Sequence, residues 1–263
     1  MEKMKAYVIH LPSRPHSVAG ASAMVEQLNN YGFEAQLFKG TDGNIVDEIF
    51  KKENRTMYPY SIKSRKLDQD EIATLLKADL PSLFWEDFNV EVRQRMRWND
   101  KEVAKISNPG VKGCFHSHYR LWRKCVDINE PIAIFEDDVK FYRGYIPVKF
   151  ENVLILSLGK SSFLNEPFKS YLENPTEYPM AVPWKNYSMP GASGYAITPQ
   201  AAKKLVKCYR DYYVPADSGM NKSVIEMDIH THIMGRNTLK EEGNVSLTKA
   251  SDWNINDNTD STG

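Results

Sequence analysis

Residues 131–141, PIAIFEDDVKF, join a short apolar run to three consecutive acids. The apolar letters IAIF favour a strand that is buried on both faces. Ligands of open α/β sheets bind outside the carboxyl ends of strands, which is where Glu136, Asp137 and Asp138 fall. Side chains alternate in direction along an extended segment, so we expect Glu136 and Asp138 to face one way and Asp137 the other.

The like-facing carboxylates of Glu136 and Asp138 predict a cation site. Oxygen ligands suit a hard divalent cation, Mg2+ or Mn2+, and such a cation would in turn hold a diphosphate. The cation would also relieve the repulsion among the clustered carboxylates. The competing interpretation is a solvated turn, because charge runs are most often exposed to water. The buried strand that precedes the acids argues against a solvated turn.

Strand-like and helix-like segments alternate on both sides of the acids, which predicts an α/β fold with a mainly parallel, twisted sheet flanked by helices. Further strands are expected over residues 5–11, 34–43, 152–159 and 191–198, and helices over 16–32, 111–128 and 199–209. We expect a single domain over residues 1–250, a charged insertion within it over 45–108, and a polar tail over 251–263.

Composition gives the chain no overall electrostatic preference. Its 263 residues include 34 Lys+Arg and 34 Asp+Glu, so no global field draws it to nucleic acid or to an anionic membrane. Because no apolar run approaches the roughly 18 residues of a membrane span, we expect a cytoplasmic protein. Cys114, Cys125 and Cys208 lack metal-type spacing, which favours reduced thiols in the core.

Six segments of the chain match, in order, the motifs of one known enzyme family. They are AYVIHLPSRPHS, LFKGTDG, PGVKGCFHSHYRLWRKC, IAIFEDDVKF, NVLILSLG and GASGYAITPQAAKKLV. In this order they resemble the glycosyltransferase family 25 enzymes, which include bacterial lipooligosaccharide glycosyltransferases and collagen galactosyltransferase domains. The most specific part is the serine-histidine block followed by the acidic triplet.

The resemblance implies a GT-A-like fold and metal-dependent transfer of a sugar from a nucleotide-sugar donor, expected to be a UDP-sugar. The implied acceptor is a saccharide of the lipopolysaccharide type. Glu136 and Asp138 become the aspartate-x-aspartate-like pair that holds the cation. The residues implied to line the nucleotide-sugar pocket are His10, Leu11, Arg14, Thr41, Asp42, Ser117, His118, Asp137, Gly191 and Ser193.

Two parts of this pocket have simpler interpretations. His118 lies on the apolar face of its predicted helix, where a histidine more often packs in the core with one hydrogen bond. Residues 191–194 are small enough for a sugar to approach the backbone, and they are also compatible with a plain tight turn.

An inverting reaction needs a carboxylate that accepts the proton of the acceptor hydroxyl. Asp228, Asp217 and Glu226 are the candidates, and we favour Asp228 for the aspartate that the family has after the last matched helix. His230 and His232 would face one side of a strand near that aspartate, although no third metal ligand is close to them in the sequence.

Two other functions compete with transfer to a saccharide. A metal-dependent phosphohydrolase would use the same acids on water, although the predicted opening strand-helix-strand unit and the GTDG turn favour a nucleotide-binding enzyme. The segments SIKSRK and RQRMRW in the insertion have the basic and aromatic character of a nucleic-acid surface or of a solvated helical face. A DNA surface there would suit a bacteriophage-type glycosyltransferase that acts on hydroxymethylated DNA bases.

Overall fold

The computed structural model of the protein describes residues 3–54, 58–59, 109–159, 168–186, 189, 191–210, 212–213, 215–222 and 224–237. Most of the predicted insertion over 45–108 and the whole tail over 251–263 lie outside these residues. Within the described part of the chain, no helix has both the length and the apolar character that a membrane crossing requires.

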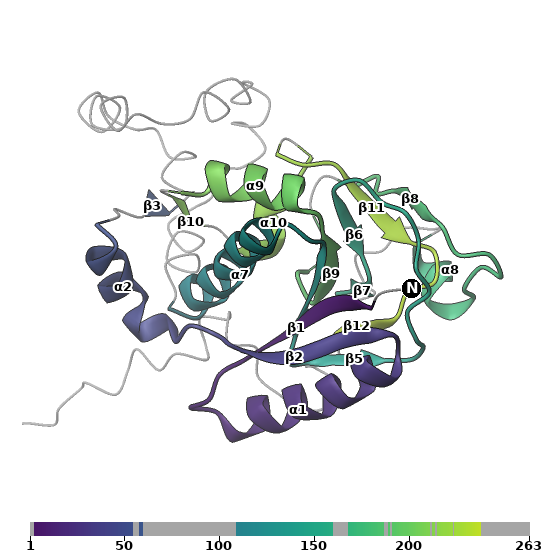
Figure 1. The fold of residues 1–263 in the computed structure, drawn as a ribbon, viewed down its shortest axis with the longest axis horizontal. Helices are drawn as coiled ribbons and strands as arrows, with labels where there is room; N and C mark the ends of the chain where they lie inside the picture. The colour runs from purple at the N-terminus through teal and green to yellow at the C-terminus, as the bar shows by residue number, and fades with distance from the viewer. Residues whose placement is uncertain are drawn as a thin grey trace, which may run out of the picture.

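A mixed seven-stranded sheet forms the centre of the described structure (Figure 1). In spatial order its strands are β2 (Phe33–Lys39), β1 (Met4–His10), β4 (Ile132–Glu136), β9 (Gly194–Ile197), β6 (Val153–Ile155), β11 (Met227–His230) and β8 (Ala181–Pro183). The α/β class is confirmed, but the sheet is less parallel than expected. Strand β9 is antiparallel to both of its neighbours, and β8 is antiparallel to β11. Apolar composition indicates burial and does not encode strand direction, which explains the difference.

Two smaller sheets flank the central one. Strands β5 (Val139–Phe141), β12 (Gly235–Asn237) and β7 (Ser157–Leu158) form one, and β10 (Tyr212–Tyr213) pairs with β3 (Tyr58–Pro59) in the other. The single strand expected over 152–159 is therefore two strands in different sheets. They separate at Leu156, which donates its N–H to the carbonyl of Gly194 and accepts from the N–H of Met234. The apolar run continues through Leu156, so the sequence gives no sign of the break.

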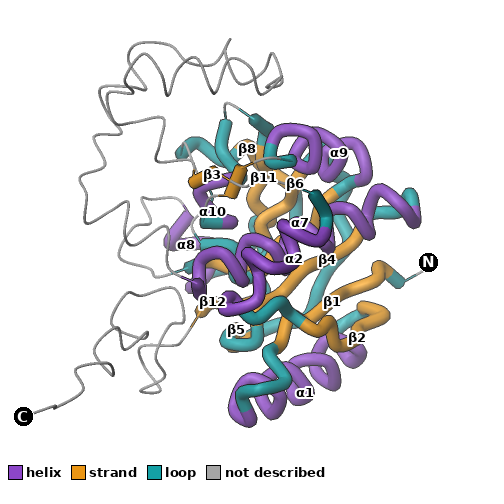
Figure 2. The backbone as a smooth tube through the Cα atoms, turned by 90° about the vertical axis from the view of Figure 1, so that its left-hand side faces the viewer, coloured by secondary structure: helices purple, strands orange, loops and turns teal. Residues whose placement is uncertain are grey.

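The two long helices after β1 and before β4 cover opposite faces of the sheet (Figure 2). Helix α1 (Pro15–Asn30) packs on one face, and α7 (Pro109–Ile128) and α9 (Pro199–Cys208) pack on the other. Strand β4 is divided between them, because Ile132 and Ile134 join the cluster with α7 while Ala133 and Phe135 join the cluster with α1. Within the described ranges, the other helices are short: η1 (Gly43–Ile45), α2 (Val46–Lys52), α8 (Phe168–Glu173) and α10 (Ala216–Gly219).

The helix boundaries follow from local chemistry. Pro199 begins α9 and the hydroxyl of Thr198 accepts from the N–H of Ala201, which is a regular N-cap. Helix α1 ends just before Gly32, whose φ of +97° suits glycine. Helix α2 lies at the start of the predicted insertion, and its Phe50 packs edge-on against His116 of α7. This part of the insertion is thus joined to the core.

Helix α7 crosses the turn after β2 at very short range. A Cβ atom added to Gly113 would lie 2.6 Å from the Thr41 carbonyl oxygen and 2.8 Å from the Gly43 nitrogen. Ser117, one turn later, accepts the N–H of Thr41 at 2.9 Å and donates to the Gly113 carbonyl at 2.7 Å. Glycine and serine at these two positions let the helix and the turn touch through backbone atoms.

We expect Gly113→Ala to destabilise the protein by about 1–3 kcal/mol, because the added methyl group forces the turn and the helix apart. Alanine favours a helix over glycine by only about 1 kcal/mol, which would not offset the displacement. Gly144→Ala is the matched control, since its Cβ would meet Tyr31 at an ordinary 3.6 Å. Urea denaturation of both variants measures the effect, and equal stability of Gly113→Ala and the wild type would contradict the close contact.

Candidate active site

The three acids after IAIF point into three different surroundings. Glu136 is the last residue of β4 and is paired with Ile9 of β1, whereas Asp137 and Asp138 form the turn between β4 and β5. The regular strand geometry behind the expected alternation of side chains therefore stops at Glu136, and a shared direction of Glu136 and Asp138 stays a prediction. The strand ends earlier than expected because the chain turns immediately into β5.

Asp137 and Asp138 have different partners. Asp137 is hydrogen-bonded to Ser17 at the start of α1, and burial raises its pKa. Asp138 is hydrogen-bonded to Asn237 of β12, and burial followed by the charges of Glu136 and Asp137 raises its pKa well above the ordinary value. Its Oδ1 atom is buried and has no hydrogen-bond partner among the described residues.

These features fit a hard cation held by Glu136 and Asp138. Two carboxylates that repel each other, one with a buried and unpartnered oxygen, supply the ligand type that Mg2+ and Mn2+ prefer. A positive charge between them would remove the repulsion that raises the Asp138 pKa.

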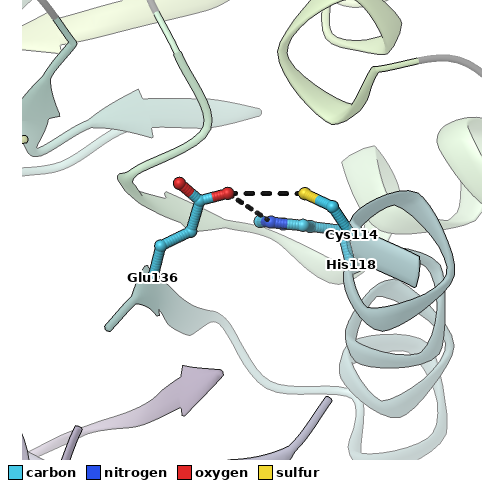
Figure 3. Close-up of side chains that lie close together, drawn as sticks. All are labelled: Cys114, His118 and Glu136. Carbon is cyan, nitrogen blue, oxygen red and sulfur yellow. Dashed lines mark hydrogen bonds and ion pairs between the residues drawn. The ribbon is translucent and has the colours of Figure 1, made fainter. Parts of the chain in front are cut away.

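Glu136 also meets two side chains of α7 (Figure 3). Its Oε1 atom lies 3.4 Å from the Cys114 sulfur and 3.5 Å from the His118 Nε2 atom. Burial, and then the negative charge of Glu136, raises the pKa of the Cys114 thiol well above its ordinary value. Cysteine and histidine four residues apart share one face of a helix. The interpretation of Cys114 as a reduced thiol in the core did not use this spacing, and the approach of Glu136 to the pair has no counterpart in the local sequence.

A buried tyrosine hydroxyl contacts the Nδ1 atom of His118. The Oη atom of Tyr195 on β9 lies 2.9 Å from His118 Nδ1 and 2.9 Å from the Nε1 atom of Trp122, which can only donate. All three side chains are fully buried. The interpretation of His118 as a core histidine with a hydrogen bond thus describes its Nδ1 side, while its Nε2 side faces Glu136.

The end of β1 and the turn after β2 lie side by side. Both carry residues of the nucleotide-sugar pocket that the family resemblance implies. Gly40 donates its N–H to the His10 carbonyl at 2.8 Å, and Thr41 donates to Ser117 on α7. The hydroxyl of Thr41 lies 2.8 Å from His116 Nδ1. These contacts give Thr41 and Ser117 a structural role at the rim of the site.

The turn after β1 is fixed in a similar way. Leu11 donates its N–H to the Ser17 hydroxyl at 2.9 Å, and Arg14 donates its N–H to the Leu11 carbonyl at 2.9 Å. Asp42 accepts the N–H of Asn44 at 2.9 Å and so caps η1. Since Asp137 binds the same Ser17, the acidic turn and the turn after β1 are directly connected.

The entry to β9 adjoins the acids because β9 is antiparallel to β4. Ser193 accepts the N–H of Glu136 at 3.0 Å, and its hydroxyl lies 3.3 Å from that of Ser157. Gly191 has a φ of +86° and donates its N–H to the Met189 carbonyl, which is the geometry of a tight turn. Both predicted residues therefore lie on the backbone leading to the site.

The candidate bases separate in space. Asp217 on α10 lies near the cluster, because after burial the charge of Glu136 raises its pKa and that of His118 lowers it. Asp228 lies within β11 opposite Leu154, and after burial the charges of Glu151 and Glu226 raise its pKa. Glu151 precedes β6 and Glu226 precedes β11, so Asp228 and Glu226 belong to the opposite edge of the sheet from Glu136.

Among the residues that the structure describes, the two histidines after Asp228 do not belong to a cluster of metal-ligand groups. His230 is fully buried, with its Nε2–H donating to the Ile146 carbonyl at 2.7 Å and its Nδ1 accepting the N–H of His232 at 2.9 Å. Both ring nitrogens are occupied in the neutral form, and burial lowers the His230 pKa. His230 therefore acts as a structural residue.

The arrangement defines a class of protein, an α/β protein with a cluster of acids where a central strand ends at the carboxyl edge of its sheet. A sequence model described as Glycosyltransferase family 25 (LPS biosynthesis protein) matches residues 4–220, and the chain belongs to this family. It is 31% identical over 133 residues to the lipooligosaccharide biosynthesis protein lex-1 of Haemophilus influenzae. It is 29% identical over 136 residues to the procollagen lysyl hydroxylase and glycosyltransferase of Acanthamoeba polyphaga mimivirus.

These matches cover only part of each protein. The first spans 44% of this chain and 41% of the Haemophilus protein, and the second spans 46% of this chain and 14% of the mimivirus protein. The family resemblance drawn from the six sequence segments is confirmed.

We expect Tyr195→Phe to destabilise the protein by about 1–3 kcal/mol, because it leaves two buried ring nitrogens without their shared partner. Tyr178→Phe is the matched control, since Tyr178 is 76% exposed. Its free energy of unfolding should differ from that of the wild type by no more than about 0.5 kcal/mol. Chemical denaturation of the two variants gives the comparison. Equal stability of both would mean that the Tyr195 hydroxyl does not bind Trp122 and His118.

Proposed function

We propose that this protein transfers a sugar from a nucleotide-sugar donor, a UDP-sugar, to an acceptor hydroxyl in a reaction that requires a divalent metal. The observation that supports this most directly is the convergence of Glu136, Asp138 and Asp217 beside the ends of β1 and β4. Membership of glycosyltransferase family 25 supports the reaction class. The acceptor we propose is a saccharide of the lipopolysaccharide type, since the Haemophilus relative is a lipooligosaccharide biosynthesis protein.

Glu136 and Asp138 would hold the cation, Mn2+ or Mg2+. When bound, that cation neutralises the charge of the diphosphate leaving group. His10 and Leu11, at the end of β1, and Asp42, after β2, border the same edge and would contact the nucleotide. The backbone at Ser193 lets the sugar approach Glu136 closely, because small side chains precede β9.

Asp217 is the better placed of the candidate bases. Its carboxylate lies near enough to Glu136 and His118 for the charges of both to act on its pKa. Asp228 and Glu226 lie at the other edge of the sheet, where they could not reach an acceptor bound beside Glu136. In an inverting reaction, Asp217 would take the proton of the acceptor hydroxyl.

A thermal-shift panel of UDP, GDP, CMP and UDP-sugars, with and without Mn2+, tests the donor and the metal together. A ligand that binds only the folded protein stabilises it by about 2.7 kcal/mol at 100 times its Kd. We expect one nucleotide to raise the melting temperature in a Mn2+-dependent way, and Asp138→Asn to abolish the Mn2+-dependent part. Asp127→Asn, an exposed position on α7, is the control that should keep it. An unchanged shift in Asp138→Asn would remove Asp138 from the cation site.

Comparison of Asp217→Asn with Asp228→Asn identifies the base. We expect Asp217→Asn to lower turnover by about 10²–10⁴-fold, the usual contribution of a positioned base, while Asp228→Asn keeps turnover near the wild type. Both variants should retain the nucleotide-dependent thermal shift, which separates chemistry from donor binding. The reverse order of activities would assign the role to Asp228.

A further inference from the structure

The proposed reaction leaves the thiol of Cys114 and the Nε2 atom of His118 without a role. Together with Glu136 Oε1 they form a compact set in which all three donor atoms lie within 4.8 Å of one another (Figure 3). Sulfur, imidazole nitrogen and carboxylate oxygen are the three donor types that proteins use for Zn2+. A hard cation such as Mg2+ would select oxygen atoms and leave the sulfur aside.

Two of the three donor separations are close to those in the coordination shell of a thiophilic ion. A tetrahedral Zn2+ site with ordinary bond lengths places sulfur and oxygen about 3.5 Å apart, and nitrogen and oxygen about 3.3 Å apart. The Cys114 thiol donates a hydrogen bond of 3.4 Å to Glu136 Oε1, and a cation would take the place of that proton. The His118 Nε2 atom lies 3.5 Å from the same oxygen. The second distance is too long for a good hydrogen bond, whose N···O length is about 2.7–3.2 Å.

His118 provides an independent observation. Its side chain is fully buried, and its Nε2 atom has no hydrogen-bond partner among the residues that the structure describes. A buried ring nitrogen without a partner is costly unless something fills the position. The Nε2 atom points directly at Glu136, as Figure 3 shows. A cation that binds this nitrogen would therefore lie between His118, Cys114 and Glu136.

Tyr195 allows His118 to present a free lone pair at Nε2. Its hydroxyl oxygen has two acceptor positions, and the Trp122 indole uses one of them. When the hydroxyl accepts from His118 Nδ1–H through the other, Nε2 is unprotonated and can bind a cation. Metal-binding histidines are usually held in this way by an acceptor on their other nitrogen.

We propose that Cys114, His118 and Glu136 form a binding site for a thiophilic divalent cation of the Zn2+ type, with one coordination position open. The cation takes the sulfur as thiolate, and the thiol proton passes to solvent. It uses only Oε1 of Glu136, so the second oxygen of that carboxylate can still serve the hard-cation site. The proposal does not depend on the proposed reaction, because the ligand set can be measured without any substrate.

Co2+ substitution tests the site directly. Co2+ bound to a thiolate gives a charge-transfer absorption in the near ultraviolet that oxygen and nitrogen ligands do not give. We expect this band at one equivalent of Co2+ in the wild-type chain, and we expect Zn2+ to abolish it by displacement. Cys114→Ser should lose the band, while Cys208→Ser, which changes a partly buried cysteine outside the cluster, should keep it.

Absence of the band in the wild type, or its persistence in Cys114→Ser, would overturn the proposal. X-ray absorption of the Zn2+-loaded wild type provides a test that needs no variant to fold. It should show one sulfur at about 2.3 Å beside nitrogen and oxygen ligands at about 2.0 Å. A shell of oxygen and nitrogen atoms alone would place the ion elsewhere and would contradict the site. Failure of nucleotide binding in the thermal-shift panel would leave these results unaffected.

Discussion

The antiparallel strand β9 is the constraint on which the rest of the site depends. Because it runs against both β4 and β6, its first residues arrive at the edge where β4 ends. The Ser193 carbonyl can then accept the N–H of Glu136, which fixes the backbone at the first of the three acids. The same direction places Tyr195 beneath α7, where its hydroxyl joins Trp122 and His118. A parallel β9 would have brought its carboxyl end, with Thr198 and the start of α9, to this edge instead.

A close backbone approach at Gly113 and side-chain hydrogen bonds to Thr41 join α7 to the other half of the site. Gly113 and Ser117 meet the turn after β2 so closely that there is no room for a larger side chain at Gly113. The helix also carries the buried His118 and the partly buried Cys114, both of which face Glu136. One rigid element therefore fixes the nucleotide-side turn and two of the groups around Glu136, so these parts keep a constant spacing. Precise positioning of this kind is what a ligand site at a sheet edge requires.

The sequence predicted the elements better than their arrangement. Apolar periodicity located α7 and α9 and the strands around residues 4–10 and 132–136, because burial on one face or on both leaves a readable pattern. It gave no access to the direction of β9 or to the break at Leu156, since hydrogen-bond partners from distant residues decide both. In the site, the run of three acids and the serine-histidine block around Ser117 could be recognised from the sequence. The partners of the acids could not: Asp137 binds Ser17, 120 residues away, Asp138 binds Asn237, 99 residues away, and Glu136 meets Cys114, 22 residues away.

The structure separates Asp228 from Asp217 in a way that the sequence could not show. The segment of Asp228 reads as the beginning of a strand or helix, and such a pattern does not tell which edge of the sheet the residue adjoins. Residues Glu151 and Glu226, whose charges act on Asp228, both precede their strands. Asp217 stands in a four-residue helix with little sequence pattern, yet α10 packs against α7 and so reaches the acids.

Glu136 belongs to both of the proposed cation sites. Its Oε1 atom faces sulfur and imidazole, and its charge acts on Asp138 and Asp217. A carboxylate is acceptable to both hard and borderline cations, whereas a thiolate favours the softer ion and a second carboxylate favours the harder one. If both proposed sites are filled, the groups that accompany Glu136 would distinguish the two cations, and not Glu136 itself. The buried hydroxyl of Tyr195 would then influence the distinction, because the role it takes toward His118 Nδ1 decides whether Nε2 is free to bind a cation.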